Sequence, residues 1–206
     1  MCNLQPRKAR YLRPPCESYQ HSTGRRRRPQ AQKMQVELSP ADIGVIHTLG
    51  ALRTAVSKAS GATPRQFGHD QTAVDVTGLA AEYAWAKHHN VFPDLTFISR
   101  RNGFDNITAG KRVDIKSTSQ LSGRLISNPQ QNNPDIDLMV LAIVQLPFVH
   151  FVGWCRPEEL RKPEHLIDLG HGPVYALGQG SPDLKPFKTA PKRKPANVAG
   201  SSVSSN

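Results

Sequence analysis

An acidic and a basic side chain, Asp114 and Lys116, lie two residues apart in an apolar segment near the middle of the chain. Residues two apart in a β-strand point to the same face, and Val113 and Ile115 would then point to the opposite face. Such a strand presents a carboxylate and an ammonium group side by side, about 7 Å apart along the strand. We therefore consider these two side chains as candidates for metal-assisted hydrolysis, in which a carboxylate can hold the ion.

A predicted turn brings a second aspartate, Asp105, to the same place. Gly110 can take the positive φ of a tight hairpin, so strands over roughly 104–107 and 112–117 would place Asp105 opposite Asp114. With β-carbons roughly 5 Å apart, the two carboxylates would repel by about 3 kcal/mol at an effective dielectric constant near 20. A bound Mg²⁺ or Mn²⁺ would offset this repulsion, because both ions take oxygen ligands.

The same hairpin also has a structural interpretation. Lys111, Arg112 and Lys116 could neutralise the two aspartates on a solvent-exposed surface without a metal ion. The spacing of the charges is compatible with both interpretations.

The net charge of +11 is concentrated at the two ends of the 206-residue chain. Residues 1–33 carry nine Lys and Arg against one acid, and residues 182–206 carry five against one, which leaves the middle near neutral. Basic ends on a neutral body favour a polyanionic partner, most simply DNA. Solvated tails without a partner are the alternative.

Both ends are predicted to be disordered, on either side of one folded domain of residues 34–181. The N-terminal arm has four prolines and a run of four arginines, and the C-terminal arm is rich in Lys, Pro and Ser. The N-terminal arm resembles a transit peptide in charge, but its prolines oppose an amphipathic helix. Met34 is an alternative start of the protein.

Cysteine usage and hydropathy indicate the compartment. Cys2, Cys16 and Cys155 form neither a CxxC motif nor a pairing framework, so no disulfide scaffold and no structural zinc site are expected. The chain lacks an apolar run of the roughly 20 residues that span a bilayer, and its N-terminus lacks the apolar core of a secretory signal. We expect an intracellular, cytoplasmic protein without membrane contact, or a nuclear one in a eukaryote.

Two helices are predicted before the hairpin. Ser39 caps the first, over roughly 40–59, and Asp42 completes a capping box. The second should run from about 78 to 89, after a loop that contains Gly and Pro. Glu82 lies at the margin of its apolar face, where the carboxylate could reach the sheet; a surface glutamate is the alternative.

The remaining pattern predicts a sheet. A strand is expected at 95–98, and the continuous apolar run 137–144 is typical of the middle of a sheet. It should pair with a strand over 149–154 through a short turn. The other predicted elements are a short strand at 124–126, a short helix at 157–160, and a loop with an edge strand over 167–177.

This order of elements resembles the PD-(D/E)XK nuclease superfamily, in particular its Holliday-junction-resolvase-like and small phage-type members. The match covers roughly residues 78–154, and its most specific segment is Val-Asp-Ile-Lys-Ser-Thr at 113–118. The resemblance implies a restriction-endonuclease-like α/β core with a mixed four- or five-stranded sheet flanked by helices. The chain departs from the family pattern between residues 119 and 134, where the usual helix has little room.

The resemblance also implies a role for each candidate site residue. Asp105 and Asp114 would bind the metal ion, and Ile115 would contribute its carbonyl oxygen. Lys116 would orient or deprotonate the attacking water. Glu82 would be a second-metal or water-bridged ligand.

We therefore expect a Mg²⁺-dependent deoxyribonuclease, a metal-dependent phosphodiesterase that acts as an endonuclease on DNA structure more than on sequence. A resolvase-like function implies a homodimer. The alternatives are a nucleic-acid-binding protein that keeps the fold without cutting, and a structural protein with a surface salt cluster. The basic residues expected to contact nucleic acid are Arg25, Arg26, Arg27, Arg28, Lys111, Arg112 and Arg124.

Overall fold

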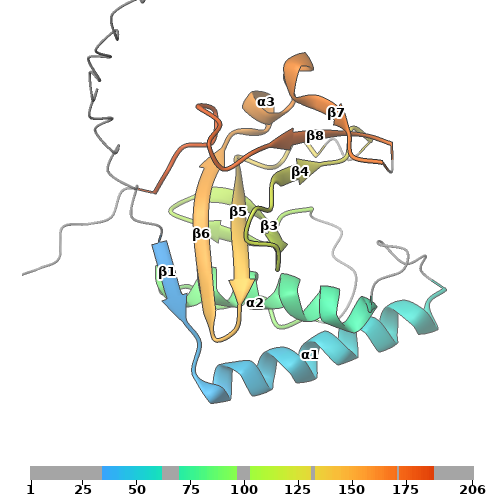
Figure 1. The fold of residues 1–206 in the computed structure, drawn as a ribbon. Helices are drawn as coiled ribbons and strands as arrows, with labels where there is room; N and C mark the ends of the chain where they lie inside the picture. Colours follow the sequence, from blue (N-terminus) through green and yellow to red (C-terminus); the bar gives the residue numbers. More distant parts are fainter. Residues whose placement is uncertain (1–33, 62–69, 97–102, 131–132, 171, 188–206) are drawn as a thin grey trace, which may run out of the picture. The chain divides into compact units, whose positions relative to one another are not determined.

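The computed structural model describes five segments, all within one compact unit: residues 34–61, 70–96, 103–130, 133–170 and 172–187 (Figure 1). The predicted arms therefore lie outside the described residues, apart from 182–187. No helix in the described segments is long and apolar enough to cross a membrane. The fold is mixed α/β, as predicted.

A five-stranded mixed sheet lies at the centre of the fold. Its strands are β1 (Met34–Glu37), β2 (Asn106–Thr108), β3 (Lys111–Thr118), β5 (Leu138–Gln145) and β6 (Phe148–Cys155). They lie in the order β1-β6-β5-β3-β2, with β3 and β5 parallel and every other neighbouring pair antiparallel. The predicted hairpin of β5 and β6 is confirmed, and β5 is buried on both faces as its continuous apolar run indicated.

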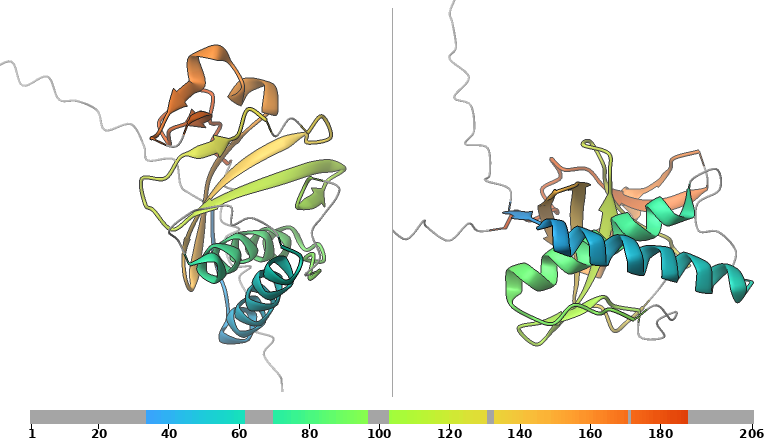
Figure 2. Two further views of the ribbon diagram at one scale, coloured as in Figure 1. Left: turned by 90° about the vertical axis from the view of Figure 1, so that its right-hand side faces the viewer. Right: turned by 90° about the horizontal axis from the view of Figure 1, so that it is seen from below.

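The helices α1 (Pro40–Ala59) and α2 (Gln71–His89) cover one face of this sheet, as Figure 2 shows. Val113 and Ile115 of β3 point into this layer, where they pack with Leu79 and Ala80 of α2 in one apolar core. Val113 and Ile115 therefore point to the face opposite to Asp114 and Lys116, as predicted.

A small second sheet and a short helix cover the opposite face (Figure 1). The elements of this layer are β4 (Leu125–Ser127), α3 (Pro157–Leu160), the 3-10 helix η1 (Pro163–His165), β7 (Leu166–Asp168) and β8 (Pro173–Leu177). The long flanking helices lie on one face only, and on this face the short helix α3 and the small sheet close the second core. The predicted edge strand at the C-terminus is in fact β8, the central strand of the order β4-β8-β7.

Helix α1 begins at the predicted capping box. The Ser39 hydroxyl accepts a hydrogen bond from the Asp42 N–H (3.2 Å), and the Asp42 carboxylate accepts one from the Ser39 N–H (2.8 Å). This reciprocal pair satisfies two backbone donors that the first helical turn leaves unpaired.

Helix α2 begins at Gln71, well before the predicted start near residue 78. Asp70 caps it, and the first two turns are rich in β-branched residues that weaken the helical signal. Val76 nevertheless packs tightly on Gly50 of α1, where an added Cβ would lie 2.6 Å from the Val76 side chain. Packing between the two helices thus overrides the weak local propensity.

The first strand was predicted in the wrong place. Leu95 and Thr96 are outside any strand, and the rest of the predicted segment 95–98 lies outside the described residues. The strand that completes the sheet is instead β1, whose four residues alternate between buried and exposed. Because β1 is so short, its alternation was too weak a signal to detect.

Residues 182–187, predicted as part of the C-terminal tail, belong to the packed body. Leu184 is only 6% exposed, and Lys185 exchanges two backbone hydrogen bonds with Trp154 of β6. Gly153 allows this close crossing, because a Cβ there would lie 2.8 Å from the Lys185 carbonyl oxygen. We call residues 181–187 the C-terminal strap.

Candidate functional site

The β2–β3 hairpin has the predicted register. Its turn residues Ala109 and Gly110 both have positive φ, 49° and 74°, as a type I′ turn requires. Three residue pairs follow from this turn and end with Asn106 opposite Val113, in the predicted register. The ladder does not continue to Asp105 and Asp114, since the Asp105 N–H donates to the Val113 carbonyl, so the pairing of these two aspartates stays a prediction.

Asp105 is held against the backbone of β3. Its Oδ2 accepts a hydrogen bond of 2.6 Å from the Ile115 N–H, while its own N–H donates to the Val113 carbonyl. The N–H and C=O of one strand residue leave the strand on the same side, so the Ile115 carbonyl also points towards the side occupied by Asp105. A carboxylate and a main-chain carbonyl oxygen thus share one edge of β3.

Asp114 and Lys116 project together from the face of β3 that points away from α1 and α2. The register with β5 places them beside Met139 and Leu141. The Lys116 Nζ lies 2.9 Å from Asp114 Oδ2, and Asp114 is 5% exposed whereas the lysine reaches solvent. We call Asp105, Asp114, Ile115 and Lys116 the edge site.

Glu82 lies in the helical layer, apart from Asp114 and Lys116. Its Oε2 is 3.2 Å from Nη1 of Arg53 in α1, and the same guanidinium donates to the carbonyl oxygens of Asp94 and Thr96. Helix α2 packs on the face of the sheet opposite to Asp114. Contrary to the prediction, Glu82 therefore does not join the two aspartates in one group of metal ligands. The glutamate instead helps to fasten α1 to α2 and to the segment that follows α2.

The edge site offers oxygen donors for one cation. Across the described segments, no three His, Cys, Asp or Glu side chains are grouped so as to hold a metal ion. The edge site combines two carboxylates with one main-chain carbonyl, and Mg²⁺ commonly takes one or two carboxylates and keeps several waters. The donor set therefore fits Mg²⁺ or Mn²⁺ in chemical type.

The basic residues of the hairpin pair with other acids than the edge-site aspartates. Arg112 contacts Asp135 at 2.7 Å and Asp137 at 3.3 Å, and Lys111 lies 4.0 Å from Asp137. The alternative in which Lys111 and Arg112 neutralise the edge-site acids is therefore not observed, although Lys116 does pair with Asp114. Arg124 is exposed just before β4, and the arginines at 25–28 lie outside the described residues.

The thiol of Cys155 is a poor nucleophile. The side chain is fully buried in the second core, and this burial raises its pKa to about 12. Because the thiolate is the reactive form, thiol chemistry at neutral pH is excluded at this residue.

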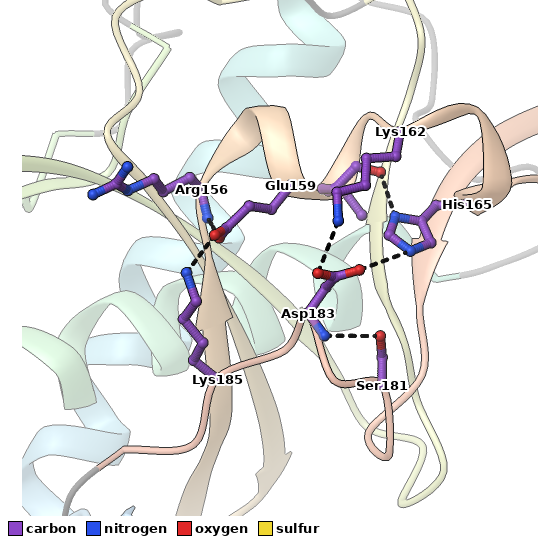
Figure 3. Close-up of polar contacts among 8 residues, drawn as sticks. Arg156, Glu159, Lys162, His165, Ser181, Asp183 and Lys185 are labelled. Atoms are coloured by element: carbon purple, nitrogen blue, oxygen red, sulfur yellow. Dashed lines mark hydrogen bonds and ion pairs between the residues drawn. The ribbon is translucent and has the colours of Figure 1, made fainter.

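A second group of charged side chains joins α3 and η1 to the C-terminal strap (Figure 3). Lys162 Nζ is 2.9 Å from Asp183 Oδ1, His165 Nε2 is 3.2 Å from Asp183 Oδ2, and Lys185 pairs with Glu159. We call these five residues the C-terminal clamp. The clamp was not predicted from the sequence, because Asp183 and Lys185 lie in a stretch with the composition of a tail.

Electrostatics within the clamp favour the charged forms. The hydrogen bond from Lys162 lowers the pKa of Asp183, and Asp183 in turn raises the pKa of Lys162. Burial alone would raise the pKa of Glu159, but hydrogen bonds from the Arg156 N–H and from Lys185 outweigh it and lower the pKa. Each charge in the clamp is thus matched by one on another segment.

Comparison with known proteins returned no matching family model, no matching curated protein and no matching solved structure.

Proposed function

We propose that the protein is a Mg²⁺-dependent DNA nuclease with a restriction-endonuclease-like core, and that the edge site is its active site. The observation that supports this most directly is the contact of the Asp105 carboxylate with the Ile115 N–H. It puts a carboxylate, a main-chain carbonyl and the Asp114–Lys116 pair around one strand edge. Within the described residues, β2 pairs with β3 only as far as Val113, so no strand covers this edge beyond Val113.

Phosphodiester hydrolysis needs charge neutralisation on the phosphate and a nucleophile made from water, and carboxylate-held Mg²⁺ supplies both when bound. Asp105, Asp114 and the Ile115 carbonyl would hold the ion. Lys116 reaches solvent and lies next to Asp114, so its ammonium group would orient the attacking water beside the phosphate. Glu82 has no part in this proposal, since it lies with Arg53 in the helical layer.

The second candidate is a nucleic-acid-binding protein that does not cut. The 2.9 Å pair between Lys116 and Asp114 favours it, because an aspartate engaged by a lysine is less available to a cation. The edge site has two acidic side chains, and the described residues contain no group of three that could hold a metal ion, which also favours binding without cleavage. The two candidates share a polyanionic partner and differ in whether the edge site binds a metal ion.

The deciding experiment is digestion of branched, nicked and linear DNA by the full-length protein, with Mg²⁺ or with EDTA. We expect Mg²⁺-dependent cleavage that Asp114→Asn and Lys116→Ala each reduce by roughly 10²–10³-fold, the scale on which single transition-state contacts act. Glu82→Gln should cut at nearly the wild-type rate. Lys58→Ala, which removes an exposed charge at the end of α1, is the matched control.

Three results would count against the proposal. Binding of DNA without cleavage would favour the second candidate. Cleavage that survives both Asp114→Asn and Lys116→Ala would place the active site elsewhere. If the protein neither binds nor cleaves DNA, a structural role would be favoured.

A further inference from the structure

A cavity of ≈ 550 Å³ opens at the end of the main sheet where β3 and β5 begin and β6 ends. Its apolar wall is formed by Ile136, Leu138 and Trp154. This volume lies within the usual range of small-molecule sites, and the site is half open to solvent. Trp154 is partly buried, and the Lys185 ammonium lies 4.9 Å from the centroid of its ring, so a ligand could pack only against the rest of the indole. The cavity begins at Lys111, roughly 10 Å along β3 from Asp114, and is separate from the edge site.

Two cations at the cavity are held only loosely by acids. Lys111 Nζ is 4.0 Å from Asp137, and Arg156 Nη1 is 3.8 Å from Glu158. Both cationic side chains are largely exposed, at 60% and 63%. Ion pairs of this length between exposed side chains contribute little to stability, so an incoming anion could replace them at small cost.

The fold does not depend on either cation. The Asp137 carboxylate already accepts hydrogen bonds from the backbone N–H and the Nε of Arg112. The bond from the backbone N–H is the main reason why the pKa of Asp137 is lowered. Asp137 therefore keeps its partners when Lys111 turns to a ligand. Figure 3 shows that the Arg156 guanidinium points away from the C-terminal clamp, while its backbone N–H donates to Glu159.

We propose that this cavity binds a nucleotide. The base would pack on the apolar wall beside Trp154, and the phosphate would lie between Lys111 and Arg156. The exposed carboxylate of Glu158 could accept hydrogen bonds from the sugar hydroxyl or the base amino group. A nucleotide has a planar base that can pack on the apolar wall and a doubly charged phosphate that can pair with the two available cations.

The bound nucleotide could be a free nucleoside phosphate or an unpaired nucleotide at the end of a DNA strand. Isothermal titration calorimetry of the full-length protein in EDTA, which prevents cleavage, would compare deoxyadenosine monophosphate with 5′-phosphorylated octathymidylate. We expect saturable binding of the monophosphate, with deoxyadenosine and deoxyribose 5-phosphate each at least about tenfold weaker. Binding of the oligonucleotide alone would identify the strand end as the source.

Charge-removing variants test the location. Lys111→Ala and Arg156→Ala should each raise the Kd of whichever probe binds about tenfold or more, the effect of losing one charge-assisted hydrogen bond. Lys58→Ala should bind like wild type, because Lys58 does not line the cavity. No saturable binding of either probe, or equal loss in the Lys58→Ala control, would overturn the proposal. Neither result depends on whether the protein cuts DNA.

Discussion

The edge site and the C-terminal clamp both consist of carboxylates paired with lysines, but they connect the chain in different ways. The clamp pairs Lys162 with Asp183 and Glu159 with Lys185, so each pair joins the strap to the distant segment that contains α3 and η1. At the edge site the pair is Asp114 with Lys116, two residues apart on one strand. A pair within one strand holds no two elements together.

The two regions also differ in what burial costs them. The clamp residue Asp183 keeps about a quarter of its side chain in solvent, whereas Asp114 is 5% exposed and belongs to the same strand edge as a second carboxylate, Asp105, which is held by the Ile115 N–H. Burying a charge beside a like charge opposes folding unless something else compensates. We infer that the clamp stabilises the fold. At the edge site Lys116 offsets the burial of Asp114, and under the proposed function this pair would serve chemistry instead.

Among the variants that test this comparison, Gly153→Ala should change the free energy of unfolding the most. The new Cβ would lie 2.8 Å from the Lys185 carbonyl oxygen and 2.9 Å from the Leu184 side chain, so the strap must move. We expect a loss of about 1–3 kcal/mol in the free energy of unfolding, the range for overpacking, measured by urea denaturation.

A matched control for that change is Gly78→Ala in α2. A Cβ at Gly78 has no atom within 4 Å, and alanine is the better helix former, so stability should stay equal or rise. An equal loss in both variants would show that the strap contact at Gly153 contributes nothing specific.

A smaller effect should separate the two sets of acids directly. Asp114→Asn keeps the shape of the side chain and takes a charged partner from one cation only, Lys116, so the urea midpoint should fall by less than in Asp183→Asn. Asp183→Asn should lower the midpoint, because Lys162 and His165 both lose a charged partner. Should Asp114→Asn prove the more destabilising of the two, the edge site would have to be regarded as structural.

Local signals made the hairpin predictable from the sequence. The glycine turn fixes the register of the three hairpin pairs, and the period of two in a strand places Asp114 and Lys116 on one face, so both follow from sequence distance alone. The capping box at Ser39 and the apolar run of β5 are equally local.

The position of Glu82 and the second sheet depend on contacts between distant segments. A helical wheel places Glu82 at the margin of a buried face, but it does not say that Arg53 of another helix lies there. In the same way, the short strand predicted at 124–126 is present as β4, but its pairing with β8 joins residues about fifty apart in the chain and leaves no local signal. The strap escaped prediction because Leu184 lies among lysines and prolines that are typical of a tail.

The smallest predicted effect is a pH dependence confined to the clamp. The pKa of Asp183 is lowered in the folded protein by the hydrogen bond from Lys162. A carboxyl group with a lowered folded pKa stabilises the fold above its unfolded value of about 3.9, and this contribution is lost as the pH falls through the folded pKa. Acidification from about pH 4 downwards should therefore loosen the strap.

Hydrogen exchange can resolve this local change, because it reports protection segment by segment. Protection of the Lys185 N–H, which donates to the Trp154 carbonyl, should fall at a higher pH than protection in the middle of β5. In Asp183→Asn the strap should already be less protected at neutral pH and should show less further change on acidification. Simultaneous loss of protection in the strap and in β5, in the wild type and the variant alike, would mean that the clamp and the core unfold as one unit and that the ion pairs of the strap make no separate contribution.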